Sequence, residues 1–342
     1  MWITLRASSV YRHTYFMDPL PRCFARRAFT AAEAVREGVS RERLRRKDIV
    51  ALGSGVYAAR ALGESSTPLQ MLQLKADALL RGRTEMWISH VSAAKVQGLW
   101  LPARLLNDDR IHLSQPPEPH VRERRDGVCG HRVSVRPTDL TTSNSLRLTT
   151  PARTWLDVAS SCTVRELIVL GDQLVRHPYP RFEGRTQPHA SPADLKNLLA
   201  ETKGTAGRRR CLTALTWIRV GADSVQETLL RLALIRAGLP EPELQVPALP
   251  GSKGSPRTDL GYPGLKIAIQ YEGDTHFTPQ QQRADQRRDN IFLAEGWVVL
   301  RFNVEDAREG FRYAVKQVRA TLAARATLTR SALAEGALIT NS

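Results

Sequence analysis

The 342-residue sequence is poor in cysteine and aromatic residues and has no long apolar run. Its four cysteines, Cys23, Cys129, Cys162 and Cys211, are dispersed without a Cys-x-x-Cys spacing. We therefore expect neither a zinc site nor a disulfide framework, and interpret them as buried thiols. No stretch reaches the roughly 18 apolar residues of a membrane helix, and arginines interrupt the start of the chain, which excludes a signal peptide. A cytoplasmic protein with no membrane partner is expected.

Negative charge is also scarce. The chain carries 50 Lys and Arg against 34 Asp and Glu, a formal net charge of +16. Such an excess attracts polyanions, because binding releases the counterions that surround them. Duplex DNA is the leading candidate partner. An RNA or ribosomal partner stays open, since charge alone does not distinguish among polyanions.

After an N-terminal extension, residues 1–29, the segment 30–60 predicts a winged helix-turn-helix. Thr30 and Glu33 have the spacing of a capping box that opens a short helix ending at Gly38. Ser40 then suits the N-cap of a second helix, and two strands around a Gly-Ser-Gly turn follow. The second helix carries the predicted DNA-binding cations Arg41, Arg43, Arg45, Arg46 and Lys47. A solvated basic face on a small structural domain is the alternative.

The middle of the chain, residues 61–205, mixes helical and strand-like runs and has no catalytic spacing. His90 and His112 are single histidines here, and we interpret them as structural or surface groups. Residues 176–192 concentrate Pro, His and Gly and predict a linker or exposed loop. A scaffolding or partner-contact role is expected for this region.

Residues 206–325 contain a regular series of elements, followed by a tail, 326–342. An amphipathic helix, three strands, a helix, a strand and a closing helix are expected in that order. Asp259 lies in the second strand, and Gln270 and Glu272 lie near the end of the third. Antiparallel pairing brings these ends together, and alternation places residues 270 and 272 on one face. The overall class is therefore α+β or α/β.

The oxygen atoms of Asp259, Gln270 and Glu272 are ligands of the kind that Mg²⁺ prefers, with Mn²⁺ as an alternative. A bound ion would activate water and neutralise charge on a scissile phosphate. Glu227 is a candidate supporting ligand. The competing interpretation is that these carboxylates pair with Arg257 or Arg288 at the end of a sheet.

The run from Asp259 through Gln270-x-Glu272-Gly273, the Arg288-Asp289 pair and the strand Gly296–Arg301 resembles the endonuclease-related domain-of-unknown-function family 559. That family is similar to the very-short-patch repair endonucleases of the PD-(D/E)xK superfamily. The resemblance implies a restriction-endonuclease-like αβββαβ core. It adds His276 and Arg288 as candidate catalytic groups, and Asp285 and Asp289 as supporting ones.

Two positions depart from that family. Gln270 stands where the family has Glu, and Glu272 stands where the nuclease motif usually ends in Lys. A neutral Gln lowers the expected metal affinity, and the missing cation must come from Arg287, Arg288 or His276.

The N-terminal part resembles the winged-helix antitoxin and regulator domains of abortive-infection type. The phrases GVYAA, SHVSAAKVQGL and LTTPARTWLD carry this resemblance. Together the two resemblances imply a DNA-binding protein with a Mg²⁺-dependent endonuclease domain. The alternative is an inactive DNA-binding regulator, or an antitoxin-like protein with a partner toxin or regulator, that retains the nuclease fold.

Overall fold

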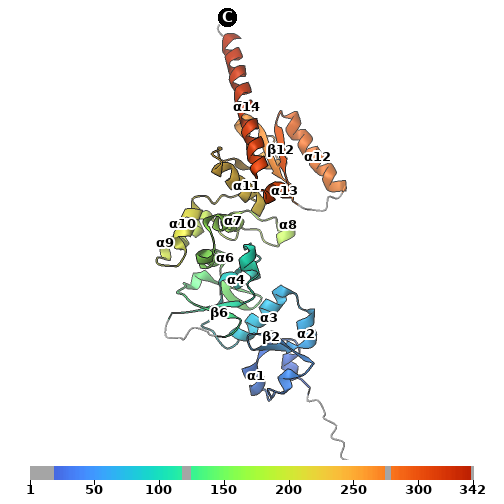
Figure 1. Cartoon of the computed structure of the whole chain (residues 1–342), viewed down its shortest axis with the longest axis vertical. Coiled ribbons are helices and arrows are strands. Elements are labelled where there is room, and N and C mark those ends of the chain that lie inside the picture. Colours follow the sequence, from blue (N-terminus) through green and yellow to red (C-terminus); the bar gives the residue numbers. More distant parts are fainter. Residues whose placement is uncertain (1–18, 118–124, 274–278, 340–342) are drawn as a thin grey trace, which may run out of the picture. The chain divides into compact units, whose positions relative to one another are not determined.

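The computed structural model describes residues 19–117, 125–273 and 279–339, which divide into two compact units (Figure 1). The N-terminal unit comprises the chain up to Trp87 together with Asp109–Val133. The C-terminal unit comprises Ile88–Asp108 together with the chain from Ser134 onward. Both units contain helices and strands, which confirms the expected α+β class. Within the described ranges, no helix combines the length and the apolar character needed to cross a membrane.

A short helix and a three-stranded antiparallel sheet form the first part of the N-terminal unit. The strands are β1 (Phe29–Thr30), β2 (Ile49–Gly53) and β3 (Val56–Ala59), in the order β1-β3-β2. The helix α1 (Ala31–Arg36) begins at the predicted capping box, in which the Thr30 hydroxyl accepts from the Glu33 backbone N–H. A preceding 3₁₀ turn, η1 (Arg22–Phe24), adds Phe24 to the apolar core.

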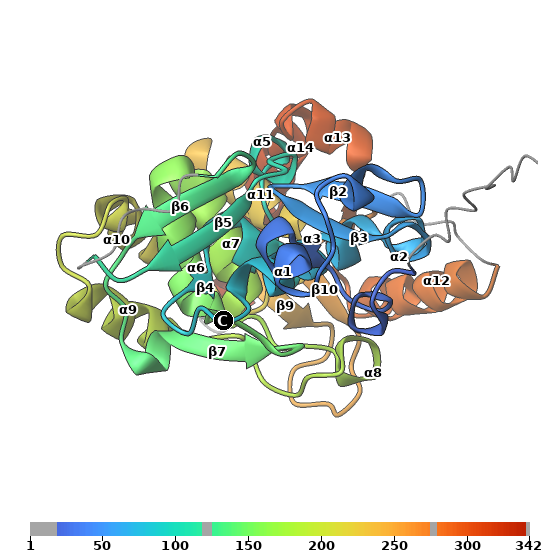
Figure 2. The same cartoon turned by 90° about the horizontal axis from the view of Figure 1, so that it is seen from below.

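The prediction of a basic helix after Ser40 is wrong. The segment forms only one 3₁₀ turn, η2 (Arg43–Arg45), because Arg46 is already extended and leads directly into β2. The N-terminal unit continues through helices and strands that the sequence placed in its mixed region: α2 (Arg60–Ser65), α3 (Pro68–Leu80), the start of β4 (Trp87–Ile88), β5 (Ile111–Gln115) and β6 (Val128–Arg132). Strands β5 and β6 lie side by side and pair in parallel (Figure 2).

A largely helical region opens the C-terminal unit. Its elements are α4 (His90–Val96), α5 (Ala103–Leu106), η3 (Pro137–Asp139), β7 (Leu140–Ser143), β8 (Leu146–Thr149), α6 (Pro151–Asp157), η4 (Val158–Ser161), α7 (Val164–Val175), α8 (Pro180–Glu183), α9 (Pro192–Glu201) and α10 (Arg208–Leu215). The segment LTTPARTWLD contains the end of β8 and all of α6, and its apolar side chains contribute to the hydrophobic core. The buried Trp155 indole N–H donates to the Leu167 carbonyl at 2.9 Å.

The rest of the C-terminal unit follows the predicted element order. It consists of α11 (Val225–Arg236), β9 (Glu243–Pro247), β10 (Arg257–Tyr262), the 3₁₀ turn η5 (Pro263–Leu265), β11 (Ile267–Tyr271), α12 (Pro279–Ala294), β12 (Val298–Phe302), α13 (Val304–Arg308) and α14 (Arg312–Ile339). The expected closing helix is split into α13 and α14, because Gly310 and Phe311 both adopt positive φ angles.

These last elements form a sheet covered by helices on both faces. The strand order is β12-β11-β10-β9, with β11 and β12 parallel and the other pairs antiparallel. Leu230 of α11 and Val318 of α14 pack with Leu260 and Ile269 on one face. Phe292 of α12 packs with Ala268 on the other, and Figure 1 shows α12 and α14 on opposite sides of β12.

Candidate functional site

Strands β10 and β11 separate at Asp259, and its carboxylate occupies the gap. The paired register runs from Tyr262 with Ile267 to Leu260 with Ile269. Beyond it, the Tyr271 backbone N–H donates to Asp259 Oδ2 at 2.8 Å instead of to a strand carbonyl. Burial raises the pKa of Asp259, against the lowering effects of this N–H and of the Arg288 charge. The strand end thus holds a partly buried acid at a fixed position.

Gln270 and Glu272 lie on the α12 face of the sheet, as alternation along the strand predicted. Each contacts an arginine. Arg288 of α12 donates to Gln270 Oε1 at 3.0 Å, and Arg301 of β12 donates to Glu272. Gln270 is 3% exposed, and its Nε2 has no hydrogen-bond partner within the described residues. The amide therefore keeps an unsatisfied donor beside the carboxylates.

Glu227 enters the same site from the first turn of α11. Ser224 caps this helix by accepting from the Glu227 backbone N–H at 3.2 Å, and Glu227 Oε2 accepts from the Asp223 backbone N–H at 2.8 Å. Burial, followed by the negative charge of Asp259, raises the pKa of Glu227 to about 8. Two acids from different elements therefore oppose each other's ionisation.

Asp223 is a site residue that the sequence analysis missed. Its charge contributes to the raised pKa of both Glu227 and Asp259. Its carboxylate accepts from the Gln245 side chain at 3.1 Å and from the Tyr179 hydroxyl. The sequence signal that could have identified Asp223 is its position immediately before the Ser224 cap. In the structure, this position lies where the first turn of α11 approaches β9.

The remaining predicted site residues fall into two groups. Asp289 pairs with Arg301, which makes Arg301 a bridge between Asp289 and Glu272. His276 and the side chain of Asp285 lie outside the described residues. The structure thus brings Glu227, Asp259, Gln270, Glu272, Arg288 and Asp289 to one end of the sheet.

No three carboxylates at this end of the sheet, so far as the structure describes it, have ligand atoms within 4.8 Å of one another. The acids occur instead as the coupled pair Glu227 and Asp259 and as the arginine-bound Glu272. The described residues do contain one group of three possible metal ligands whose ligand atoms lie this close together. It consists of His112, Cys129 and His131 in the N-terminal unit.

The five predicted DNA-binding cations do not share one environment. Arg43 is 8% exposed and binds Asp48 through two hydrogen bonds of 2.7 and 2.6 Å. It therefore holds the turn to β2 and is not available to a phosphate. The other four, Arg41, Arg45, Arg46 and Lys47, are exposed.

Comparison with known proteins finds two similar sequences from Mycobacterium tuberculosis, uncharacterized protein MT2308 and uncharacterized protein Rv2248. Each is 32% identical to this chain over 118 residues. The match spans 34% of this chain and 43% of the length of either relative. No protein-family profile matches the chain, and no solved structure matches it.

Proposed function

We propose that the chain is a DNA-binding protein whose C-terminal site hydrolyses phosphodiester bonds with a divalent metal ion. The observation that carries this proposal is the buried pair Glu227 and Asp259: burial raises the pKa of both carboxyl groups, and the charge of Asp259 adds to the rise at Glu227. A divalent cation would relieve the repulsion between the two charges and draw both groups into the ionised form. Perturbed, coupled acids at one end of a sheet are typical of catalytic sites.

The residues present fit Mg²⁺ or Mn²⁺, since the site offers oxygen donors from Glu227 and Asp259, with Gln270 as a neutral neighbour. When bound, the ion would polarise a scissile phosphate and supply an activated water. Arg288 and Arg301 supply the positive charge that a lysine supplies in the family motif, and they can stabilise phosphate oxygens. The order αβββαβ, with Asp259 in the second strand, supports a restriction-endonuclease-like core.

The four exposed cations after Ser40 support duplex DNA as the partner. They precede the β2–β3 hairpin, which would be the wing if this segment bound DNA in the manner of a winged helix. We assign phosphate contact to Arg41, Arg45, Arg46 and Lys47, and an internal structural role to Arg43.

The test is cleavage of supercoiled plasmid by the full-length protein with Mg²⁺ or Mn²⁺. Asp259→Asn and Glu227→Gln each remove one charge from the pair. We expect each to lower the cleavage rate by about 100-fold or more, the scale of removing one group that stabilises charge in a transition state. Glu243→Gln, an exposed acid on β9, is the matched control and should cleave like the parent. Undiminished cleavage in both site variants would falsify the assignment.

A second candidate function is a DNA-binding regulator or antitoxin-like protein without nuclease activity. The contacts of Arg288 with Gln270 and of Arg301 with Glu272 favour it. Each guanidinium binds a side-chain oxygen that would otherwise be available to a metal ion. A parent protein that shifts duplex DNA but leaves it intact with either ion would establish this function. Preference for structured RNA over duplex at equal salt would favour an RNA partner instead.

A further inference from the structure

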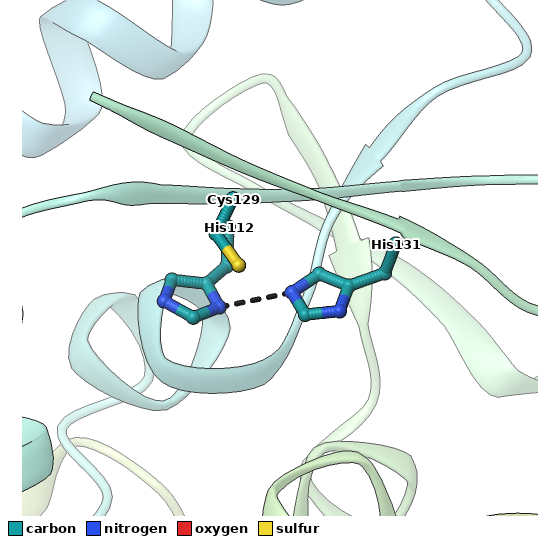
Figure 3. Close-up of side chains that lie close together, drawn as sticks. All are labelled: His112, Cys129 and His131. Carbon is teal, nitrogen blue, oxygen red and sulfur yellow. Dashed lines mark hydrogen bonds between the residues drawn. The ribbon is translucent and has the colours of Figure 1, made fainter. Parts of the chain in front are cut away.

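Three side chains of the N-terminal unit converge on one point across strands β5 and β6. They are His112, Cys129 and His131, and their ligand atoms all lie within 4.8 Å of one another. Figure 3 shows both imidazole rings and the Cys129 sulfur directed toward the same space. The chain spacing shows only Cys129 and His131, two residues apart, because the third member, His112, lies on a separate strand.

Strand register explains the convergence. In the parallel pair, His112 lies opposite Cys129, and Ser114 lies opposite His131. Cys129 and His131 are two residues apart on β6, so alternation places both on the same face. The pairing of β5 with β6 therefore adds the nitrogen donor of His112 to the sulfur and nitrogen donors that Cys129 and His131 place on one face of β6.

The contact between the two rings is of a kind that a metal ion can replace. His112 Nδ1 and His131 Nε2 lie 3.0 Å apart, and the rings stack with centroids 5.2 Å apart. One of these nitrogens must donate a proton to the other. A cation in place of that proton would accept both lone pairs.

We propose that His112, Cys129 and His131 bind a divalent transition metal ion, with Zn²⁺ as the natural occupant. One thiolate and two imidazoles are a borderline-soft donor set, which selects Zn²⁺ and similar ions over Mg²⁺. Tetrahedral zinc with these donors has ligand atoms roughly 3.3 to 3.6 Å apart, so the two ring nitrogens need to separate slightly from 3.0 Å, while all three ligand atoms already lie within 4.8 Å of one another. Water completes the fourth position. The ion would tie β5 to β6 and stabilise the N-terminal unit.

This site is independent of the proposed nuclease site, since it lies in the other unit and has a different metal preference. Binding releases the Cys129 thiol proton, and the imidazole that donates in the ring contact changes tautomer, so that its proton moves to its other nitrogen and both facing nitrogens can bind the ion. Because protons compete with the metal for the thiolate and the imidazoles, affinity falls as the pH falls. Metal binding also protects Cys129 from alkylation, because a metal-bound sulfur reacts poorly with alkylating reagents.

The first experiment titrates the full-length protein with Co²⁺ as a spectroscopic substitute for Zn²⁺. We expect one equivalent to bind with a sulfur-to-cobalt charge-transfer band and the visible bands of a tetrahedral ion, and Zn²⁺ to displace it. Cys129→Ser and His131→Asn should abolish the charge-transfer band and the tetrahedral spectrum respectively. Cys23→Ser, which removes an exposed thiol elsewhere in the same unit, is the matched control and should retain both. A spectrum unchanged in Cys129→Ser would overturn the proposal.

The second experiment needs no variant and therefore does not depend on whether a variant folds. The parent protein is alkylated with and without Zn²⁺, and each cysteine is followed by peptide mass. Zn²⁺ should protect Cys129 at least tenfold while leaving exposed Cys23 reactive. Equal labelling of Cys129 in both conditions would refute the site.

Discussion

Glu227 is a carboxylic acid that is only 6% exposed, at the first turn of α11. Its backbone N–H is satisfied by Ser224, and its side chain accepts from the Asp223 backbone N–H. The neighbouring acids Asp259 and Asp223 oppose its ionisation, and burial does so more strongly. Glu227 was predicted only as a supporting carboxylate, but its pKa is the most strongly shifted among the acids of the site.

The raised pKa of Glu227 predicts a pH-dependent stability. Below its unfolded-state pKa the group is protonated in both states, and its titration costs no stability. As the pH rises toward about 8, the unfolded chain ionises while the folded chain holds its proton, so stability is lost over this window. Glu227→Gln lacks that titration. Without divalent metal, we expect its melting temperature to exceed that of the parent increasingly from pH 5 to 8, with no further divergence above this range.

Thermal unfolding of both proteins in EDTA across this pH range measures the effect. Glu243→Gln removes an exposed acid from the same sheet and should follow the parent at each pH. A constant difference between Glu227→Gln and the parent would show that burial, and not titration, sets the change.

Helices α7 and α11 are joined by a buried ion pair. Arg231 is 0% exposed, and one of its terminal nitrogens donates to Asp172 Oδ2 at 2.9 Å. The same Asp172 carboxylate accepts from the Thr228 hydroxyl at 2.9 Å and from the Arg219 backbone N–H at 2.8 Å. Burial raises the pKa of Asp172, and the Arg231 charge opposes that rise. The junction therefore depends on both partners being present.

Arg231→Met tests this junction. Removing the cation leaves Asp172 as a buried, uncompensated charge, which costs about 3–5 kcal/mol of unfolding free energy. Urea unfolding at pH 7 measures the loss. Arg219→Met is the control, because its side chain binds Glu241 at the surface and should cost about 1 kcal/mol or less. Equal losses in the two variants would contradict a special role for the buried pair.

Elements with strong local signals were predicted well. The capping box at Thr30, the strand Arg257–Tyr262 and the helix that ends before Gly238 all depend on contiguous residues, and all are present. The helix expected after Ser40 failed because its charges resemble a helical face, whereas Arg43 turns inward to Asp48 and the chain becomes extended at Arg46. The helix propensity of these residues is outweighed there, because the chain must become extended to enter β2.

The net charge of +16 belongs to the whole molecule, and it predicts salt-sensitive binding to duplex DNA. Removing one cation that binds a DNA phosphate should reduce the slope of log K against log salt by about 0.9. Arg45→Ala with Arg46→Ala removes two exposed cations and should lower both affinity and slope. Lys196→Ala with Lys203→Ala removes the same charge at exposed positions of the C-terminal unit. Identical slopes for the two double variants would place the DNA-binding surface elsewhere.

The sequence by itself determined the α+β class, the order of elements from α11 to β12 and the excess of positive charge, because these depend on composition and on neighbouring residues. Tertiary structure alone decided which charges are buried and which donors meet. Glu227 reaches Asp259 through the packing of α11 on the sheet, and His112 meets Cys129 through strand register. Both are long-range pairings whose energies come from residues far apart in the chain, so no local pattern records them.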